Sequence, residues 1–215
     1  MKFGGTSVAN LDRIKKAAIK VKSKILKDKE KVIVVVSAMS GVTNNLVKNF
    51  NKISNDINNP EYDIILSTGE QYSSGVMSVV LNKLGIKSRS LLGWQIPIIT
   101  DDKYGKARIK SINSQQIKKL FKSFDVLVVA GFQGLSNEHR VTTLGRGGSD
   151  TTAVALAVAT KSNFCEIFTD VEGIFTSDPR IVSKAKKIKN ITYEEILEMS
   201  SAGSKVLHPR SVELA

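Results

Sequence analysis

Residues 32–36 read Val-Ile-Val-Val-Val, and residues 125–130 read Asp-Val-Leu-Val-Val-Ala. Neither run alternates apolar and polar residues, which is typical of strands that are buried on both faces. The segments around them carry apolar residues at helical spacing. Strands of this kind alternating with helices predict an α/β fold, in which helices cover both faces of a mostly parallel sheet.

The remaining elements follow from the same patterns. We expect helices at residues 11–28, 42–56, 63–84, 114–122, 149–160 and 193–201. We expect further strands at residues 86–92, 97–100, 107–112 and 164–169. Because no internal repeat and no linker interrupts these elements, we expect residues 1–215 to form a single domain.

The composition excludes several classes of protein. Of the 215 residues, 41% are apolar, which is typical of a globular chain. A single cysteine, Cys165, excludes a disulfide framework, and His139 and His208 are too few to complete a Cys/His zinc site with it. No apolar run approaches the ~18 residues of a membrane span. No signal peptide follows Met1, so we expect a cytoplasmic protein without a membrane partner.

The formal net charge of +12 raises the question of a nucleic-acid partner. Much of the excess lies in residues 10–31, where the lysines lie mainly off one apolar stripe of the expected helix, formed by Ile14, Ala18, Val21 and Ile25. We interpret these lysines as a solvated helix face. A nucleic-acid-binding helix is the alternative, but Lys outnumbers Arg 25 to 7, aromatic residues make up only 6%, and no nucleic-acid-binding motif occurs. We therefore expect no nucleic-acid partner.

Three polar or glycine-rich clusters lie where predicted strands lead into helices, the edge at which open α/β sheets bind ligands. The first cluster is Lys2-Phe3-Gly4-Gly5-Thr6-Ser7. Glycines let backbone amides approach an anion closely, and the adjacent lysine adds positive charge. The cluster matches neither GxxxxGK[ST] nor GxGxxG, so a simple tight turn is an equally good interpretation.

The second cluster is Gly145-Arg146-Gly147-Gly148-Ser149-Asp150-Thr151-Thr152, at the start of the helix expected over residues 149–160. Ser149 or Asp150 would cap this helix, and the amides of its first turn point at the loop. Three glycines with an arginine at a helix start favour an anion pocket. An ordinary capped helix is the alternative, although it needs only one of these features.

The third cluster is Thr-Asp-Val-Glu-Gly-Ile-Phe-Thr-Ser-Asp-Pro-Arg at residues 169–180, in which Gly173 and Asp178-Pro179 indicate turns. It could clamp a nucleotide, with Arg180 near the phosphates, or it could be an ordinary surface loop.

Two shorter clusters complete the set. Residues 37–43 offer hydroxyl groups directly after the strand at 32–36. Residues 67–70 read Ser-Thr-Gly-Glu, and the carboxylate of Glu70 could hold a substrate ammonium group or simply cap a helix.

Together these loops resemble those of the aspartate kinases in the amino-acid kinase family. The matching strings occur in family order over nearly the whole chain: KFGGTSV at 2–8, SAMSGVTN at 37–44, STGE at 67–70, VAGFQG at 129–134, TTLGRGGSDTTAVALA at 142–157, TDVEGIFTSDPR at 169–180 and GSKVLHPRSVE at 203–213. Related kinases for acetylglutamate, glutamate or UMP share the fold but not this complete set.

The resemblance implies a fold and a reaction. The fold would be the three-layer α/β/α sandwich of the amino-acid kinases, which is similar to carbamate kinase. The reaction would be ATP-dependent phosphorylation of the side-chain carboxylate of L-aspartate to 4-phospho-L-aspartate, the first step of lysine, threonine and methionine biosynthesis. Mg²⁺ would accompany ATP and be held by its phosphates, with no metal ligand from the chain.

The resemblance also implies roles for individual residues. Lys2 and Asp150 would be catalytic, with Lys2 stabilising the transferred phosphoryl group and Asp150 organising the lysine. The residues that would contact the nucleotide are Lys2, Phe3, Gly4, Gly5, Ser37, Thr169, Asp170, Phe175, Arg180 and Lys205. The residues that would hold aspartate are Thr43, Glu70, Arg146, Gly147, Gly148 and Ser149. Phe175 stands where the family usually has tyrosine, so the ring is kept and a hydroxyl contact is lost.

Elementary chemistry is consistent with this reaction. The side-chain carboxylate of aspartate has an ordinary pKa of about 3.9, so it is already ionised at neutral pH. No general base is needed, and catalysis must come from positioning and from neutralising charge. Lysine, arginine and backbone amides are suitable groups for that task.

The chain also departs from the family pattern at both ends. Family members have a few apolar residues before KFGG, and they continue beyond RSVE into the last strands and paired regulatory ACT domains. We therefore expect a catalytic domain without the start of its first strand, its last strands and its ACT domains, and we expect full-length relatives to be homo-oligomers. The alternatives are an inactive fragment or non-catalytic subunit of the same family, or a family kinase with another acid substrate.

Overall fold

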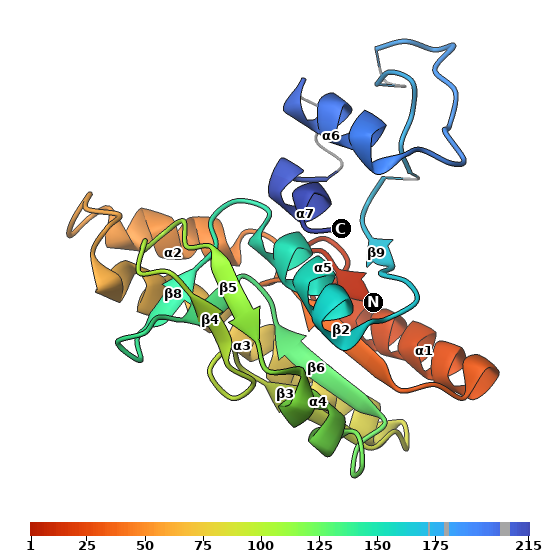
Figure 1. The fold of residues 1–215 in the computed structure, drawn as a ribbon, viewed down its shortest axis with the longest axis horizontal. Helices are drawn as coiled ribbons and strands as arrows, with labels where there is room; N and C mark the ends of the chain where they lie inside the picture. Colours follow the sequence, from red (N-terminus) through yellow and green to blue (C-terminus); the bar gives the residue numbers. More distant parts are fainter. Residues whose placement is uncertain (172, 179–180, 203–206) are drawn as a thin grey trace.

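The central sheet of the computed structural model is fully parallel, with five strands in the order β3-β6-β2-β1-β9 (Figure 1). The structure describes residues 1–171, 173–178, 181–202 and 207–215. The five strands are β1 (Lys2–Phe3), β2 (Val32–Val36), β3 (Ser88–Leu91), β6 (Val126–Ala130) and β9 (Ile167–Phe168). The two apolar runs of the sequence are the adjacent strands β2 and β6, paired from Val32 with Val126 to Val36 with Ala130.

Helices cover both faces of this sheet, which confirms the predicted three-layer α/β/α sandwich (Figure 1). One face packs against α1 (Leu11–Asp28) and α3 (Pro60–Lys83), and the other against α4 (Ser114–Leu120) and α5 (Gly148–Thr160). The side chains of β2 alternate between the two layers, since Val34 and Val36 join the α1 side and Val35 joins the α5 side. α2 (Val42–Phe50) packs along α3.

α1 matches its predicted range. Its first turn is capped by Asn10, whose side chain accepts a hydrogen bond from the backbone N–H of Arg13 at 2.9 Å. The predicted apolar stripe lies against the sheet and α3, with Ile14, Ala18 and Val21 completely buried and Ile25 partly buried.

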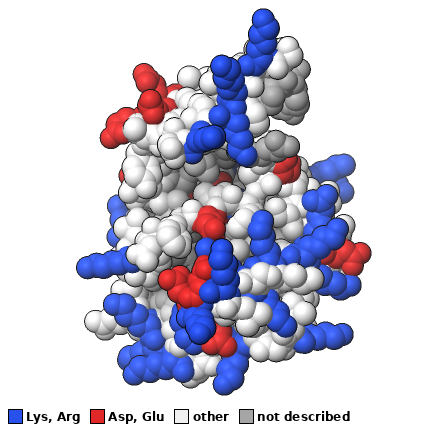
Figure 2. All heavy atoms as spheres, turned by 90° about the vertical axis from the view of Figure 1, so that its right-hand side faces the viewer, with Lys and Arg blue, Asp and Glu red and all other residues white. Residues whose placement is uncertain are grey.

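The outer face of α1 carries lysines that are interspersed with acidic residues. Lys15 pairs with Asp12 at 3.0 Å, and Lys24 pairs with Asp28 at the same distance. Figure 2 shows the side of the molecule on which α1 lies, where basic side chains extend into solvent with acidic ones between them. This arrangement fits the interpretation of a solvated helix face.

A second sheet has four strands in the order β5-β4-β7-β8. Its strands are β4 (Ile98–Thr100), β5 (Ile109–Ile112), β7 (Gln133–Leu135) and β8 (Val141–Thr143). The β4–β5 and β7–β8 pairs are antiparallel, whereas β4 and β7 are parallel. The sequence pattern did not separate this sheet from the first, and it missed β7 and β8, because three residues reading Gln-Gly-Leu or Val-Thr-Thr carry no periodic signal.

Several predicted boundaries were wrong. The helix expected over 42–56 ends at Phe50, and the one expected over 63–84 already begins at Pro60, because Asn59 caps it and proline suits its first position. The strand expected over 164–169 is limited to β9. α6 (Tyr193–Ser201) agrees with its predicted range, whereas α7 (Pro209–Glu213) was not predicted. Among the described residues, no helix combines the length and apolar character that crossing a membrane requires.

Candidate active site

Four loops meet at one edge of the parallel sheet, because the carboxyl ends of parallel strands share an edge. The chain leaves β1 at Gly4, β2 at Ser37, β6 at Gly131 and β9 at Thr169. Backbone hydrogen bonds join these exits in sequence across the sheet: Gly4 N donates to Phe168 O at 3.1 Å, Ser37 N to Phe3 O at 3.1 Å, and Gly131 N to Val36 O at 3.0 Å. The predicted ligand loops are therefore neighbours in space.

A buried ion pair joins β1 to α5. Along β1, Phe3 points into the α1 side of the core, so Lys2 points toward α5. There its Nζ lies 2.7 Å from Oδ1 of Asp150, with both side chains at most 15% exposed. Asp150 lies in the first turn of α5, where the helix dipole favours a negative charge. The pair holds the lysine charge at a fixed position on the edge of the sheet.

The loop between β8 and α5 depends on glycine at two positions. Gly145 and Gly147 have φ values of 74° and 73°, which favour glycine strongly. A Cβ on Gly145 would lie 3.0 Å from Gly105 O, and one on Gly147 would collide with His208. The sequence analysis expected Ser149 or Asp150 to cap α5, but Gly147 is the cap and both side chains lie in the first turn. Arg146, between the two glycines, is exposed.

Glu70 lies near the middle of α3 and is only 4% exposed. Its Oε1 accepts a hydrogen bond from Ala38 N at 3.0 Å, and its buried Oε2 has no hydrogen-bond partner in the described part of the chain. Burial raises the pKa of this carboxyl to about 7. A buried acceptor without a donor is costly, so the geometry favours a ligand that supplies one.

A cavity of about 310 Å³ opens between these loops. It brings together predicted residues from four separate segments: Lys2, Gly5, Ser37, Thr43, Glu70, Arg146, Gly147, Gly148, Ser149 and Asp150. It also includes residues that the sequence analysis did not select: Ala38, Met39, Ser40, Gly41, Asn44, Phe132 and Gly145. The cavity thus places one buried carboxyl group opposite basic groups and a glycine-rich helix start, which suits a ligand of mixed charge.

Phe132 is the most unusual of the residues that sequence reasoning missed. Its φ of 70° is rare for a residue other than glycine, asparagine or aspartate. Its backbone N–H donates to Oγ1 of Thr152 at 3.1 Å, which ties the exit of β6 to α5. A left-handed phenylalanine leaves no periodic signal in a sequence, so only its place in the VAGFQG string could have drawn attention to it.

The model of the Amino acid kinase family matches residues 1–215. This chain belongs to that family. An aspartokinase from Rickettsia felis is 53% identical over 217 residues, covering 99% of this chain and 54% of that protein. The crystal structure of aspartate kinase from Synechocystis has a TM-score of 0.85 and 45% identity, covering 100% of this chain and 35% of that one. E. coli aspartokinase III in complex with aspartate and ADP has a TM-score of 0.85 and 30% identity, covering 100% and 58%. The chain spans about half the length of the curated relatives it matches.

The residues predicted for the nucleotide are less concentrated in this chain than those predicted for the acid. Phe3 and Gly4 do not line the cavity: the Phe3 ring is buried and stacks on Phe168, with ring centroids 4.9 Å apart, and the Gly4 amide is bonded within the sheet. Thr169 and Asp170 are exposed just beyond β9, and Phe175 is half-buried farther along the same loop. Arg180 and Lys205 lie outside the described residues.

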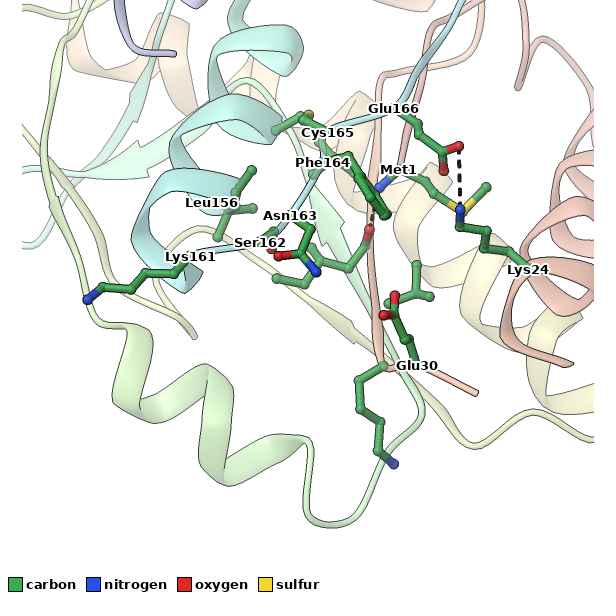
Figure 3. Close-up of a pocket in the computed structure, with 16 residues that line it drawn as sticks. Met1, Lys24, Glu30, Leu156, Lys161, Ser162, Asn163, Phe164, Cys165 and Glu166 are labelled. Carbon is green, nitrogen blue, oxygen red and sulfur yellow. Dashed lines mark hydrogen bonds and ion pairs between the residues drawn. The ribbon is translucent and has the colours of Figure 1, made fainter. Parts of the chain in front are cut away.

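A second cavity, of about 340 Å³, lies at the opposite, amino ends of the parallel strands (Figure 3). It is bordered by the start of β2 and the end of α5, and it is lined by Lys24, Glu30, Lys161 and Glu166 among others. None of the described residues that were predicted to bind a ligand lines it. Volume alone therefore does not identify the functional site.

Proposed function

We propose that this chain is the catalytic domain of an aspartate kinase, with residues 1–215 as one domain. It would transfer the γ-phosphoryl group of ATP to the side-chain carboxylate of L-aspartate, giving 4-phospho-L-aspartate and ADP, as the first step of lysine, threonine and methionine biosynthesis. The observation that carries this proposal is the set of charged groups in the 310 Å³ cavity, which is lined by Arg146, by the Lys2–Asp150 pair and by Glu70, whose Oε2 has no hydrogen-bond partner among the described residues. Aspartate carries the complementary charges, one ammonium group and two carboxylates.

The substrate would be held at both charged ends. Oε2 of Glu70 would accept a hydrogen bond from the ammonium group and thereby gain a donor, which none of the described residues supplies. The guanidinium of Arg146 would bind a carboxylate in a bidentate manner, through two parallel N–H···O hydrogen bonds. The contacts would be completed by other residues that line the same cavity: the hydroxyls of Ser149 and Thr43 and the backbone of Gly147 and Gly148.

The phosphoryl transfer needs no proton acceptor. One oxygen of the ionised side-chain carboxylate attacks the γ-phosphorus, and the bond from that phosphorus to the β,γ-bridging oxygen breaks, so ADP leaves with the electron pair. Lys2 would stabilise the negative charge of the transferred group. Asp150 would keep Lys2 in place at 2.7 Å, which also makes a carboxylate tolerable beside phosphates.

The nucleotide would lie along the exits of β1, β2 and β9. Gly5 and Ser37 line the cavity, while Thr169 and Asp170 extend this edge of the sheet beyond β9. The Phe175 ring would stack on the base without the hydroxyl contact of a tyrosine. Contacts from Phe3, Gly4, Arg180 and Lys205 remain predictions.

Mg²⁺ fits this site as an ion that is bound through the phosphates of ATP. Of the two carboxyl groups in the cavity, Asp150 is paired with Lys2 and Glu70 is buried and bonded to Ala38, so neither forms a multi-carboxylate cage. When bound, Mg²⁺ would neutralise phosphate charge, which is its usual use at nucleotide sites. We also propose a cytoplasmic location and, for the full-length protein, a homo-oligomeric assembly.

The decisive experiment incubates the folded chain with ATP, Mg²⁺ and aspartate, and traps the acyl phosphate with hydroxylamine. We expect hydroxamate with aspartate but not with glutamate or acetylglutamate. Lys2→Ala should reduce the rate by about 100- to 1,000-fold, since one charge-stabilising donor is lost. Lys15→Ala, an exposed lysine on α1, serves as the control and should not change it.

Two outcomes contradict the proposal. Preference for another acid would indicate a family kinase with a different substrate. Absence of hydroxamate from a correctly folded chain would support an inactive fragment or a non-catalytic subunit.

A further inference from the structure

A second fully buried carboxylate lies on α3, about two turns before Glu70. Asp63 is 0% exposed, and no basic side chain among the described residues pairs with it. Burying such a charge is costly unless hydrogen bonds compensate for it. The cavity of the proposed reaction does not include Asp63, so its burial calls for another explanation.

The hydrogen-bond donors to Asp63 come from Gly105, in the loop between β4 and β5, and from Thr143 in β8. Gly105 N donates to both carboxylate oxygens, at 2.9 and 3.0 Å. Thr143 donates through its backbone N–H and through its hydroxyl, each at 2.7 Å. Both oxygens therefore accept from neutral donors. Burial raises the pKa of this carboxyl above its usual range, and the hydrogen bonds from Thr143 and Gly105 oppose that rise because they favour the charged form.

These two partners support the start of the loop that carries Arg146. Thr143 is the last residue of β8, three residues before Arg146, and its carbonyl accepts a hydrogen bond from Ala107 N at 2.9 Å. Gly145 rests directly on Gly105, because a Cβ on Gly145 would lie 3.0 Å from the Gly105 carbonyl oxygen. One carboxylate thus fixes both the strand end that leads into the loop and the turn on which the loop lies.

The far side of the same loop is held by α7. Nη1 of Arg210 donates to the Leu144 carbonyl at 3.0 Å, and His208 packs against Gly147. Asp63 supplies a second charged side chain, which bonds to the two residues that support this loop, Gly105 and Thr143. The loop is therefore clamped between a buried carboxylate and a short helix.

We propose that Asp63 is a positioning residue, which holds the Gly145–Gly147 loop so that Arg146 faces the acid substrate. This inference deepens the proposed aspartate kinase function and rests on it. Position 63 requires a carboxylate because its two oxygens accept hydrogen bonds from two backbone amides and a hydroxyl at once. An asparagine offers one acceptor oxygen, and its NH₂ group would face a donor, so a buried N–H would be left without a partner.

Strand β8 offers a matched pair of variants for the test. Thr142 and Thr143 are adjacent and both 0% exposed, but the Thr142 hydroxyl bonds to Thr100 at 2.6 Å instead of to Asp63. Thr143→Val removes one bond to Asp63, whereas Thr142→Val removes an equally buried bond that does not involve Asp63. Thr143→Ser keeps the hydroxyl and should restore the behaviour of the original chain.

The kinetic test compares KM for aspartate with KM for ATP. We expect Asp63→Asn and Thr143→Val to raise KM for aspartate about 10-fold or more, because small displacements of a binding group are costly. KM for ATP should be unchanged, and Thr142→Val should change neither constant. Equal rises in KM for aspartate with Thr142→Val and Thr143→Val would overturn the proposal, since a purely structural role predicts them.

A second measurement separates this proposal from the proposed function. Hydrogen exchange of the amides in residues 144–149 requires no turnover. We expect these amides to exchange about 10-fold faster in Asp63→Asn and Thr143→Val, with α1 and the Thr142→Val variant unaffected. Unchanged exchange in Thr143→Val would refute the positioning role even if Asp63→Asn does not fold. A chain without kinase activity but with this exchange pattern would contradict only the proposed function.

Discussion

The two cavities at opposite ends of the parallel sheet have similar volumes, about 310 and 340 Å³, but their charged groups are partnered differently. At the amino ends, Lys24 pairs with Glu166 at 3.6 Å and Lys31 with Asp125 at 2.8 Å, all at least a quarter exposed. At the carboxyl ends, the Lys2–Asp150 pair is almost buried, and one buried oxygen of Glu70 has no hydrogen-bond partner in the part of the chain that the structure describes.

This difference teaches that incomplete partnering, rather than volume, distinguishes a binding site from a surface depression. Exposed ion pairs contribute little to the free energy of unfolding, so breaking one destabilises the protein only slightly. Buried groups without partners destabilise the free chain, and such groups are retained at sites where a ligand completes them. Four substitutions can break or sharpen this comparison.

The largest effect is expected from Asp150→Asn compared with Glu166→Gln. Removing Asp150 leaves the buried Lys2 without its partner, which should cost about 3 kcal/mol of unfolding free energy and about 100-fold or more in kcat. Glu166→Gln breaks an exposed pair and should cost less than about 1 kcal/mol, without effect on kcat. Urea unfolding and the hydroxamate assay measure both quantities. Similar losses in the two variants would remove the distinction between the cavities.

The next effect concerns pH and Glu70. Burial raises the pKa of this carboxyl to about 7 in the folded chain, compared with 4.5 in the unfolded one. Between these values the folded chain holds a proton that the unfolded chain has released, so the unfolding free energy falls as pH rises through this window. Glu70→Gln has no such proton, and at pH 8 it should be more stable than the original chain by up to about 3 kcal/mol, with no difference near pH 4.

The same carboxyl should make substrate binding depend on pH. A substrate ammonium group pairs with the ionised form, so KM for aspartate should fall as pH rises toward 7 and then level off.

Parallel stability curves for Glu70→Gln and the original chain between pH 4 and 8, measured by thermal unfolding, would show that the Glu70 environment is not as described.

A smaller effect is expected from Arg146→Lys. Lysine keeps the charge but cannot bind a carboxylate with two parallel N–H groups, so KM for aspartate should rise about 10-fold while kcat changes little. Lys161→Ala at the other cavity is the control and should leave KM unchanged. A rise in KM for ATP instead would assign Arg146 to the nucleotide.

The smallest effect is expected from Phe175→Tyr. The new hydroxyl group restores the usual family residue and adds at most one hydrogen bond, so KM for ATP should fall by no more than about 10-fold. KM for aspartate should not change. A fall in KM for aspartate alone would contradict the placement of this ring at the nucleotide.

The sequence predicted the central sheet well and the second sheet poorly, for a physical reason. β2 and β6 are buried on both faces, so each of their residues must be apolar and the run is visible without context. β7 and β8 are three residues long and are stabilised by pairing with each other and with β4, which is far away in sequence. Such strands exist because of their partners, and a local pattern does not contain that information.

The site residues that the sequence predicted differ from those that it did not predict in a similar way. The glycine and arginine loop was recognisable from its own residues and from the family strings, and the cavity includes Arg146 with its neighbours. Phe132 and Asp63 were not recognisable, because a left-handed backbone and the burial of a carboxylate in the first turn of a helix both depend on distant segments. An aspartate at that position looks like an ordinary favourable charge near a helix start.

One rigid element, α3, carries both Asp63 and Glu70. Seven residues separate them, so the helix spaces the support of the arginine loop and the ammonium acceptor by about 10 Å along its axis. Because α3 is one continuous helix, the spacing between the proposed support of the arginine loop and the proposed ammonium acceptor cannot change unless α3 bends or unwinds.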